Sequence, residues 1–102
     1  MKPEEIEQLR QVFGAYFHQD WDLDAPDVDG VIDQFIADQR GRAQLVQLAA
    51  LVDAYADSFQ NDSELARALI NELWCDYLPR TAGTTAREWM QHVATRLRAA
   101  KR

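Results

Sequence analysis

The chain has 102 residues, a mass of 11.7 kDa and a formal net charge of −6 at pH 7. This length predicts a single domain over residues 1–102, and a hydrophobic fraction of 47% is enough for a core, which excludes intrinsic disorder. No run approaches the ~18–20 apolar residues that cross a bilayer, and the acidic N-terminus lacks the character of a secretory signal. The single cysteine, Cys75, cannot form an intrachain disulfide. We therefore expect a soluble, cytoplasmic protein.

The charge is distributed unevenly along the chain. Residues 1–40 carry ten acidic and three basic side chains, whereas residues 79–102 carry one acidic and six basic side chains. One interpretation is that the two ends neutralise each other, with Arg87, Arg96 and Arg98 facing the acidic N-terminal region. Another is that the acidic half docks a basic partner, because complementary fields speed encounter and reject wrong partners. Both can hold, and the acidic balance argues against nucleic-acid binding.

Apolar side chains recur at helical spacing in the first half of the chain. The spacing predicts a helix over residues 4–17, and the pattern breaks over residues 18–27, where Pro26 would stop any helix that continued. A second helix is predicted over residues 28–39, with Asp27 as its N-cap.

The second half of the chain continues the helical pattern. The most regular apolar stripe covers residues 43–59, and a turn at residues 60–63 supplies the N-cap of a helix over residues 64–77. Thr85 and Glu88 form a capping box for the last helix. The helix over residues 64–77 is expected to bury Leu65, Leu69, Ile70, Leu73, Trp74 and Tyr77. Since no segment alternates at period two, we expect an all-α fold, a compact bundle of about five helices.

An acidic loop is the first candidate for a metal site. The spacing Asp20-x-Asp22-x-Asp24 is similar to the start of a calcium-binding EF-hand loop, which requires glycine at the sixth position and glutamate at the twelfth. Those positions hold Ala25 and Val31, so we expect no calcium binding.

The remaining reactive residues do not form a catalytic pattern. His18 and Asp20 lack the further ligands that a metal site needs, because the other histidine, His92, lies in the last helix. A nucleophilic Cys75 would need an adjacent, oriented histidine, and a half-buried thiol is the default interpretation. We therefore expect no enzyme, metal or cofactor. The alternative is a metal-dependent hydrolase using His18 and the aspartates, which would require a tightly bound ion.

Trp21 has two interpretations, because this large aromatic residue lies in a polar loop between Asp20 and Asp22. It can cap the hydrophobic core, or it can anchor a basic partner. We favour the cap.

Two segments carry a resemblance to a known family. Residues 16–22, Tyr-Phe-His-Gln-Asp-Trp-Asp, resemble the N-terminal signature of bacterial immunity proteins from contact-dependent growth inhibition systems. Residues 77–79, Gly83 and residues 87–90 are similar to the family's C-terminal pattern, which is a tyrosine-proline loop, a glycine and an Arg-Glu-Trp helix start. The resemblance spans about residues 6–98. The loop is basic at Arg80, where we would expect a more acidic stretch.

The resemblance implies a non-enzymatic, cytoplasmic inhibitor that binds the C-terminal toxin domain of a delivered toxin, often a basic nuclease. An alternative is an acidic helical adaptor or regulatory protein that binds a basic protein segment. We expect a monomer with no nucleic-acid or membrane partner. The expected partner-binding face consists of Asp22, Asp24, Asp27, Asp29 and Asp33. The expected structural residues of the motifs are Tyr16, Phe17, His18, Asp20, Trp21 and Trp89.

Overall fold

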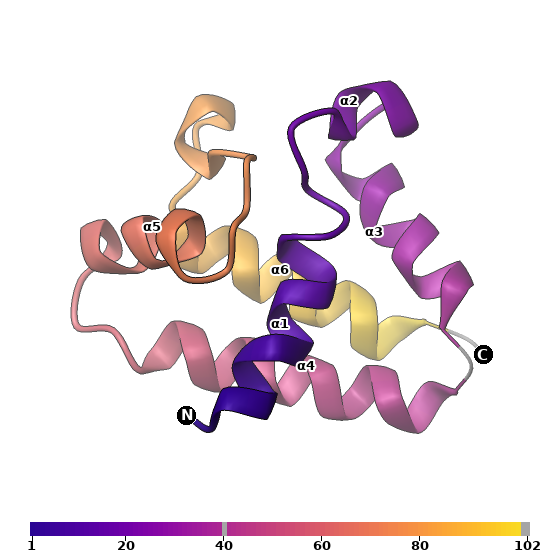
Figure 1. The fold of residues 1–102 in the computed structure, drawn as a ribbon, viewed down its shortest axis with the longest axis horizontal. Coiled ribbons are helices and arrows are strands. Elements are labelled where there is room, and N and C mark those ends of the chain that lie inside the picture. The colour runs from indigo at the N-terminus through magenta and orange to yellow at the C-terminus, as the bar shows by residue number, and fades with distance from the viewer. Residues whose placement is uncertain (40, 101–102) are drawn as a thin grey trace.

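The computed structural model describes residues 1–39 and 41–100, and within them every regular element is helical (Figure 1). The expectation of an all-α fold is confirmed. Six α-helices occur in the described residues rather than about five, because one short turn of helix forms where only an interruption was expected. The elements are α1 (Pro3–Phe13), α2 (Trp21–Asp24), α3 (Val28–Asp38), α4 (Arg42–Asp57), α5 (Asp62–Asn71), the 3₁₀ helix η1 (Pro79–Ala82) and α6 (Ala86–Ala99).

Side-chain caps set the starts of three helices. The Asp27 carboxylate accepts the backbone N–H of Gly30 at 2.7 Å, as expected for the N-cap of α3. In the predicted turn before α5, Asn61 caps the helix by accepting the N–H of Glu64 at 2.9 Å. The expected capping box of α6 is confirmed.

Two helices end earlier than the apolar spacing indicates. α1 stops at Phe13 instead of residue 17, and α5 stops at Asn71 instead of residue 77. The two ends meet at Gly14, where a Cβ atom would lie 2.8 Å from the carbonyl oxygen of Leu73. This close approach depends on the tertiary fold, and the periodicity of either helix alone cannot indicate it.

The early end of α5 changes the surface of the following segment. Trp74 has a φ of 61° and is 58% exposed, and Ile70 is 43% exposed, so the expectation that both are buried is wrong. The Arg10 guanidinium lies 4.0 Å from the centre of the Trp74 ring, and its Nε donates a 2.7 Å hydrogen bond to the carbonyl oxygen of Glu72. The indole is therefore held on the surface by a cation–π contact.

The core lies mainly between α4 and α6, which make the most extensive helix–helix contact, and α1 packs across α4 (Figure 1). The α2–α3 arm and the α5–η1 arm rise from this pair, so α2 and η1 lie along the same edge of the molecule. None of the helices in the described residues combines the length and the apolar character that a membrane span requires. Buried core residues from α4 and α6 include Leu45, Ala49, Val52, Met90, Val93 and Leu97.

Candidate functional site

The aspartates that the sequence assigns to partner binding lie on α2, at the N-cap of α3 and within α3. Asp29 and Asp33 are four residues apart on α3, so they occupy one face together. Arg96 of α6 lies in the field of both and of Asp27. Asp22 lies on α2. Of Asp24 only the backbone is described, and its side chain lies outside the described part of the structure.

Basic side chains of α6 neutralise part of this acidic face. His92 Nε2 lies 2.8 Å from one carboxylate oxygen of Asp29, and Arg96 contacts the other at 3.6 Å. Arg96 also donates to Asp33 at 2.5 Å, a hydrogen bond that raises the pKa of the Arg96 guanidinium. All four side chains remain partly exposed, so each pair contributes at most about 1 kcal/mol to stability. Their main consequence is that Asp29 and Asp33 present less free charge to a partner.

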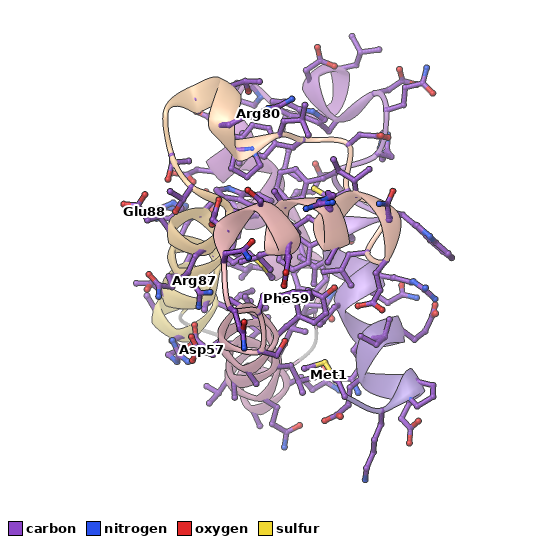
Figure 2. The ribbon with its side chains drawn as sticks, turned by 90° about the vertical axis from the view of Figure 1, so that its left-hand side faces the viewer. Met1, Asp57, Phe59, Arg80, Arg87 and Glu88 are labelled. Carbon is purple, nitrogen blue, oxygen red and sulfur yellow. The ribbon has the colours of Figure 1, made fainter. Side chains whose placement is uncertain are left out.

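The three arginines of α6 that were expected to face the acidic N-terminal region have partners on two different helices, α3 and α4. Arg96 does face it, which confirms that part of the expectation. For Arg87 and Arg98 the expectation is wrong, because both pair with α4: Arg98 with Asp53, and Arg87 with Asp57 at 3.4 Å. Arg87 also donates to the carbonyl oxygen of Phe59 at 2.7 Å (Figure 2). The extensive contact between α4 and α6 brings Asp53 and Asp57 of α4 next to these two arginines, although the paired residues lie 30 or more positions apart in the sequence.

The exposed side of α2 carries an acidic residue and an apolar residue, Asp22 and Leu23. Within the described residues Asp22 forms no ion pair, and its side chain is exposed. The neighbouring Leu23 is 80% exposed, which is the highest exposure of any large apolar side chain among the described residues. The exposure of Leu23 was not predicted from the sequence, although its position between two aspartates and outside any apolar stripe was a signal. The backbone N–H of Asp20 donates to Nδ1 of His18 at 3.0 Å, so His18 lies in this loop and not at the end of α1.

The inner side of the same loop rests on a cluster of aromatic rings. Phe17 is fully buried, with its ring centre 5.1 Å from that of Trp89 and 6.3 Å from that of Trp21. The half-buried Trp21 also meets the ring of Tyr77 edge-on at 5.6 Å. Trp21 therefore packs onto the core instead of projecting from it, and it fixes the position of α2.

Tyr16 ties the loop to α3. Its hydroxyl donates a 2.5 Å hydrogen bond to a carboxylate oxygen of Asp38, and its ring meets Phe35 edge-on at 5.1 Å. Burial and the hydrogen bond to Asp38 raise the pKa of Tyr16 to about 12. The phenol is therefore neutral at physiological pH and acts as a hydrogen-bond donor.

The Cys75 side chain is buried, although its neighbours Trp74 and Asp76 are exposed. The N–H of Asp76 donates to the carbonyl oxygen of Phe17 at 2.8 Å, which joins this segment to the loop. Burial raises the pKa of the Cys75 thiol to about 12, which strongly disfavours the thiolate that a nucleophile requires. Among the residues that the structure describes, no three His, Cys, Asp or Glu side chains gather as metal ligands would.

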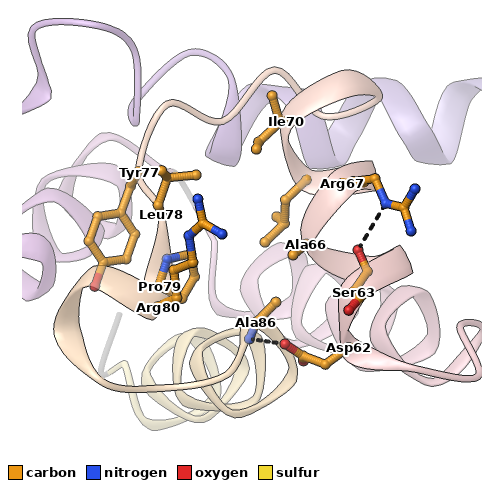
Figure 3. A pocket seen from close by; sticks show the side chains of 11 residues that line it. Asp62, Ser63, Ala66, Arg67, Ile70, Tyr77, Leu78, Pro79, Arg80 and Ala86 are labelled. Carbon is orange, nitrogen blue, oxygen red and sulfur yellow. Dashed lines mark hydrogen bonds between the residues drawn. The ribbon is translucent and has the colours of Figure 1, made fainter.

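A pocket of about 530 Å³ opens between α5 and residues 77–80 (Figure 3). The Asp62 carboxylate at its edge accepts the backbone N–H groups of Ala86 at 3.1 Å and Arg87 at 2.9 Å. Asp62 thereby compensates the positive N-terminus of α6. From the sequence Asp62 was expected in a turn, whereas it begins α5 and binds the start of α6, a long-range contact that was not predicted.

The comparison with known proteins bears on the same motifs. A family model described as CdiI immunity protein matches residues 5–97, which includes the aromatic loop at residues 16–22 and the start of α6. No curated protein and no solved structure matches the chain. Since the matched segment covers far more than half of the sequence, the chain belongs to the family of CdiI immunity proteins, and this membership implies toxin neutralisation in contact-dependent growth inhibition.

Proposed function

We propose that this protein acts in the cytoplasm as the immunity protein of one toxin, whose C-terminal domain it binds in a stoichiometric, non-catalytic complex. The observation that carries the proposal is the family match over residues 5–97. The net charge of −6 supports a basic toxin domain, such as a nuclease, because opposite fields accelerate encounter. An inhibitor of this charge would compete with a phosphate substrate for a basic cleft.

The toxin-facing surface that we propose is the exposed side of α2 with the adjoining face of α3. Asp22 supplies charge that no described residue of this protein neutralises. Asp27 contributes less, because its carboxylate caps α3. Asp29 and Asp33 also contribute less, because Arg96 already pairs with them. Asp24 completes the group by its place in the sequence, directly after Leu23.

Coexpression tests the proposed function directly. The tagged protein is produced together with the toxin domain encoded immediately upstream of its gene, and both the eluted complex and the growth of the host cells are measured. We expect a stoichiometric complex and protection from the toxin. A toxin domain that neither co-elutes nor loses its toxicity would contradict the proposal and favour an acidic adaptor with another basic partner.

A further inference from the structure

The pocket beside α5 has the character of an apolar socket. Side chains of Ala66 and Ile70 form one wall, and Leu78 and Pro79 line the opposite wall (Figure 3). Its volume of about 530 Å³ falls within the ~300–1,000 Å³ that is typical of ligand-binding pockets. The socket is therefore large enough to accept an apolar side chain from another molecule.

Two arginines at this socket are unlike the arginines of α6. Arg87, Arg96 and Arg98 each pair with a carboxylate, as described above. Within residues 1–39 and 41–100, Arg67 and Arg80 form no ion pair, and both line the socket. Arg67 donates only to the backbone oxygen of Ser63, at 3.5 Å. The edge of the socket thus carries two arginines without an ion pair, and its one carboxylate, Asp62, is already engaged by the backbone N–H groups at the start of α6.

The α2 turn has the complementary character. Leu23 is 80% exposed, and the unpaired carboxylate of Asp22 precedes it. Trp21 fixes the turn from below through its contacts with Phe17 and Tyr77, at ring distances of 6.3 and 5.6 Å. Leu23 is therefore an apolar projection on a supported turn with acidic neighbours, which we call the plug. A plug and a socket of opposite charge occur on the same chain.

We propose that the plug of one copy of this protein inserts into the socket of a second copy. Leu23 would enter between α5 and residues 77–80, and Asp22 would meet Arg67 or Arg80. α2 and η1 lie along the same edge of the molecule (Figure 1). The proposed arrangement is a two-fold dimer in which the copies exchange plugs reciprocally across this edge. The proposed dimer differs from the monomer expected from the sequence.

The expected association is weak and concentration-dependent. The contact buries one leucine and few charges per copy, which is characteristic of a small, transient interface with a dissociation constant in the micromolar range or above. Burial of a leucine side chain is a large part of such an interface, so its replacement by a charged residue should weaken the dimer at least about tenfold.

Sedimentation velocity of the purified full chain, from micromolar to millimolar concentration, tests the dimer. We expect the wild type to shift from monomer toward dimer and Leu23→Asp to remain monomeric. Val46→Asp is the matched control, because Val46 is a 42% exposed residue on α4, outside the socket, and the substitution adds the same charge. Circular dichroism verifies that each variant is folded. A wild type that stays monomeric at millimolar concentration overturns the proposal, as does equal weakening by both substitutions.

A mixing experiment tests the reciprocal geometry. The Leu23→Asp variant retains its socket, and the double variant Arg67→Glu/Arg80→Glu retains its plug. Each alone should be monomeric, whereas an equimolar mixture should form a heterodimer through one intact plug and socket. The heterodimer should bind at least about tenfold more weakly than the wild-type dimer, which has two such contacts. If the wild type dimerises and the mixture does not, the plug does not occupy this socket.

One consequence rests on the proposed function as well. The dimer would cover Asp22, which we also assign to the toxin-facing surface, so the toxin domain should convert the dimer into a complex with a single copy. A toxin complex that retains both copies would contradict the assignment of α2 to the toxin. It would leave the sedimentation results on the dimer unaffected, so the two proposals can fail separately.

Discussion

The α6 helix and the edge formed by α2 and η1 use charge in opposite ways. On α6 the residues His92, Arg96 and Arg98 all meet carboxylates from α3 or α4. Along the edge, Asp22 and Arg80 have no such partner in the described residues, and Leu23 is largely exposed. The charged side chains of α6 form ion pairs between helices, whereas those along the α2–η1 edge remain able to pair with another molecule.

This difference shows that the number of charges along a sequence does not locate a binding surface. The aspartates of α3 and α2 look equivalent in the sequence, but Asp33 already has an arginine and Asp22 does not. Only a charge that its own protein leaves unpaired contributes its full field to a partner. The α2 edge is therefore the better candidate for recognition.

The largest expected effect is a loss of stability on the inner side of α2, compared with little change on its outer side. Trp21→Ala should lower the free energy of unfolding by about 2 kcal/mol, because the half-buried indole packs on Phe17 and Tyr77. Leu23→Ala, two residues away, should change it by less than about 0.5 kcal/mol because Leu23 is exposed. Urea denaturation followed by circular dichroism measures both. Equal losses would mean that the two sides of α2 are not distinct.

A charge reversal compares an acidic residue of α2 with one of α1. Asp22→Lys should weaken binding of the toxin domain by about tenfold, mainly through slower association, since a rim charge acts on the encounter. Glu4→Lys is the control, because Glu4 is also exposed and also holds the second position of a helix. Surface plasmon resonance at two salt concentrations measures the rates. Unchanged association for Asp22→Lys would remove α2 from the interface.

The buried thiol of Cys75 should make the protein sensitive to alkali. The pKa of Cys75 rises from its usual value near 9 to about 12, so the folded state retains the thiol proton more firmly than the unfolded state. This contribution is complete below the unfolded pKa and decreases as the pH rises from about 9 toward 12, amounting to about 1 kcal/mol lost by pH 10. Denaturant unfolding at pH 8 and pH 10 should show a smaller decrease for Cys75→Ala than for the wild type. Equal decreases would indicate that the thiol is hydrated.

The smallest expected effect comes from removing Arg96, which leaves Asp33 without its ion pair. Arg96→Gln should cost less than about 1 kcal/mol of stability, because its ion pairs with Asp29 and Asp33 are partly exposed. Since the substitution frees Asp33 and leaves Asp29 with His92 as its remaining partner, association with a basic toxin domain should become faster. Arg98→Gln breaks a comparable pair with Asp53 on α4 and serves as the control. Faster association for both variants would reflect net charge alone and not the α3 face.

Local signals in the sequence accounted for much of the fold. The N-cap at Asp27 and the capping box of Thr85 and Glu88 were predictable because each cap involves residues only three positions apart. The ends of α1 and α5 were not predictable, because they depend on the contact of Gly14 with the backbone of Leu73. Residues 59 positions apart leave no trace of each other in helical periodicity.

The candidate site was predictable in composition but not in its pairing. The acidic cluster and the motif at residues 16–22 are visible in the sequence, as is the basic C-terminal end. Which aspartate remains unpaired follows from the position of α6 across α3, which brings Arg96 to Asp33. The exposure of Leu23 follows from Trp21, whose inward packing leaves the neighbouring leucine on the outside.

The sequence by itself determined the all-α class, the starts of the capped helices and membership in the immunity-protein family, because these depend on local spacing and on short motifs. Tertiary structure alone decided which charges are neutralised and which apolar side chains stay on the surface. Those properties depend on distances between helices, and both electrostatic attraction and burial act through space irrespective of separation along the chain.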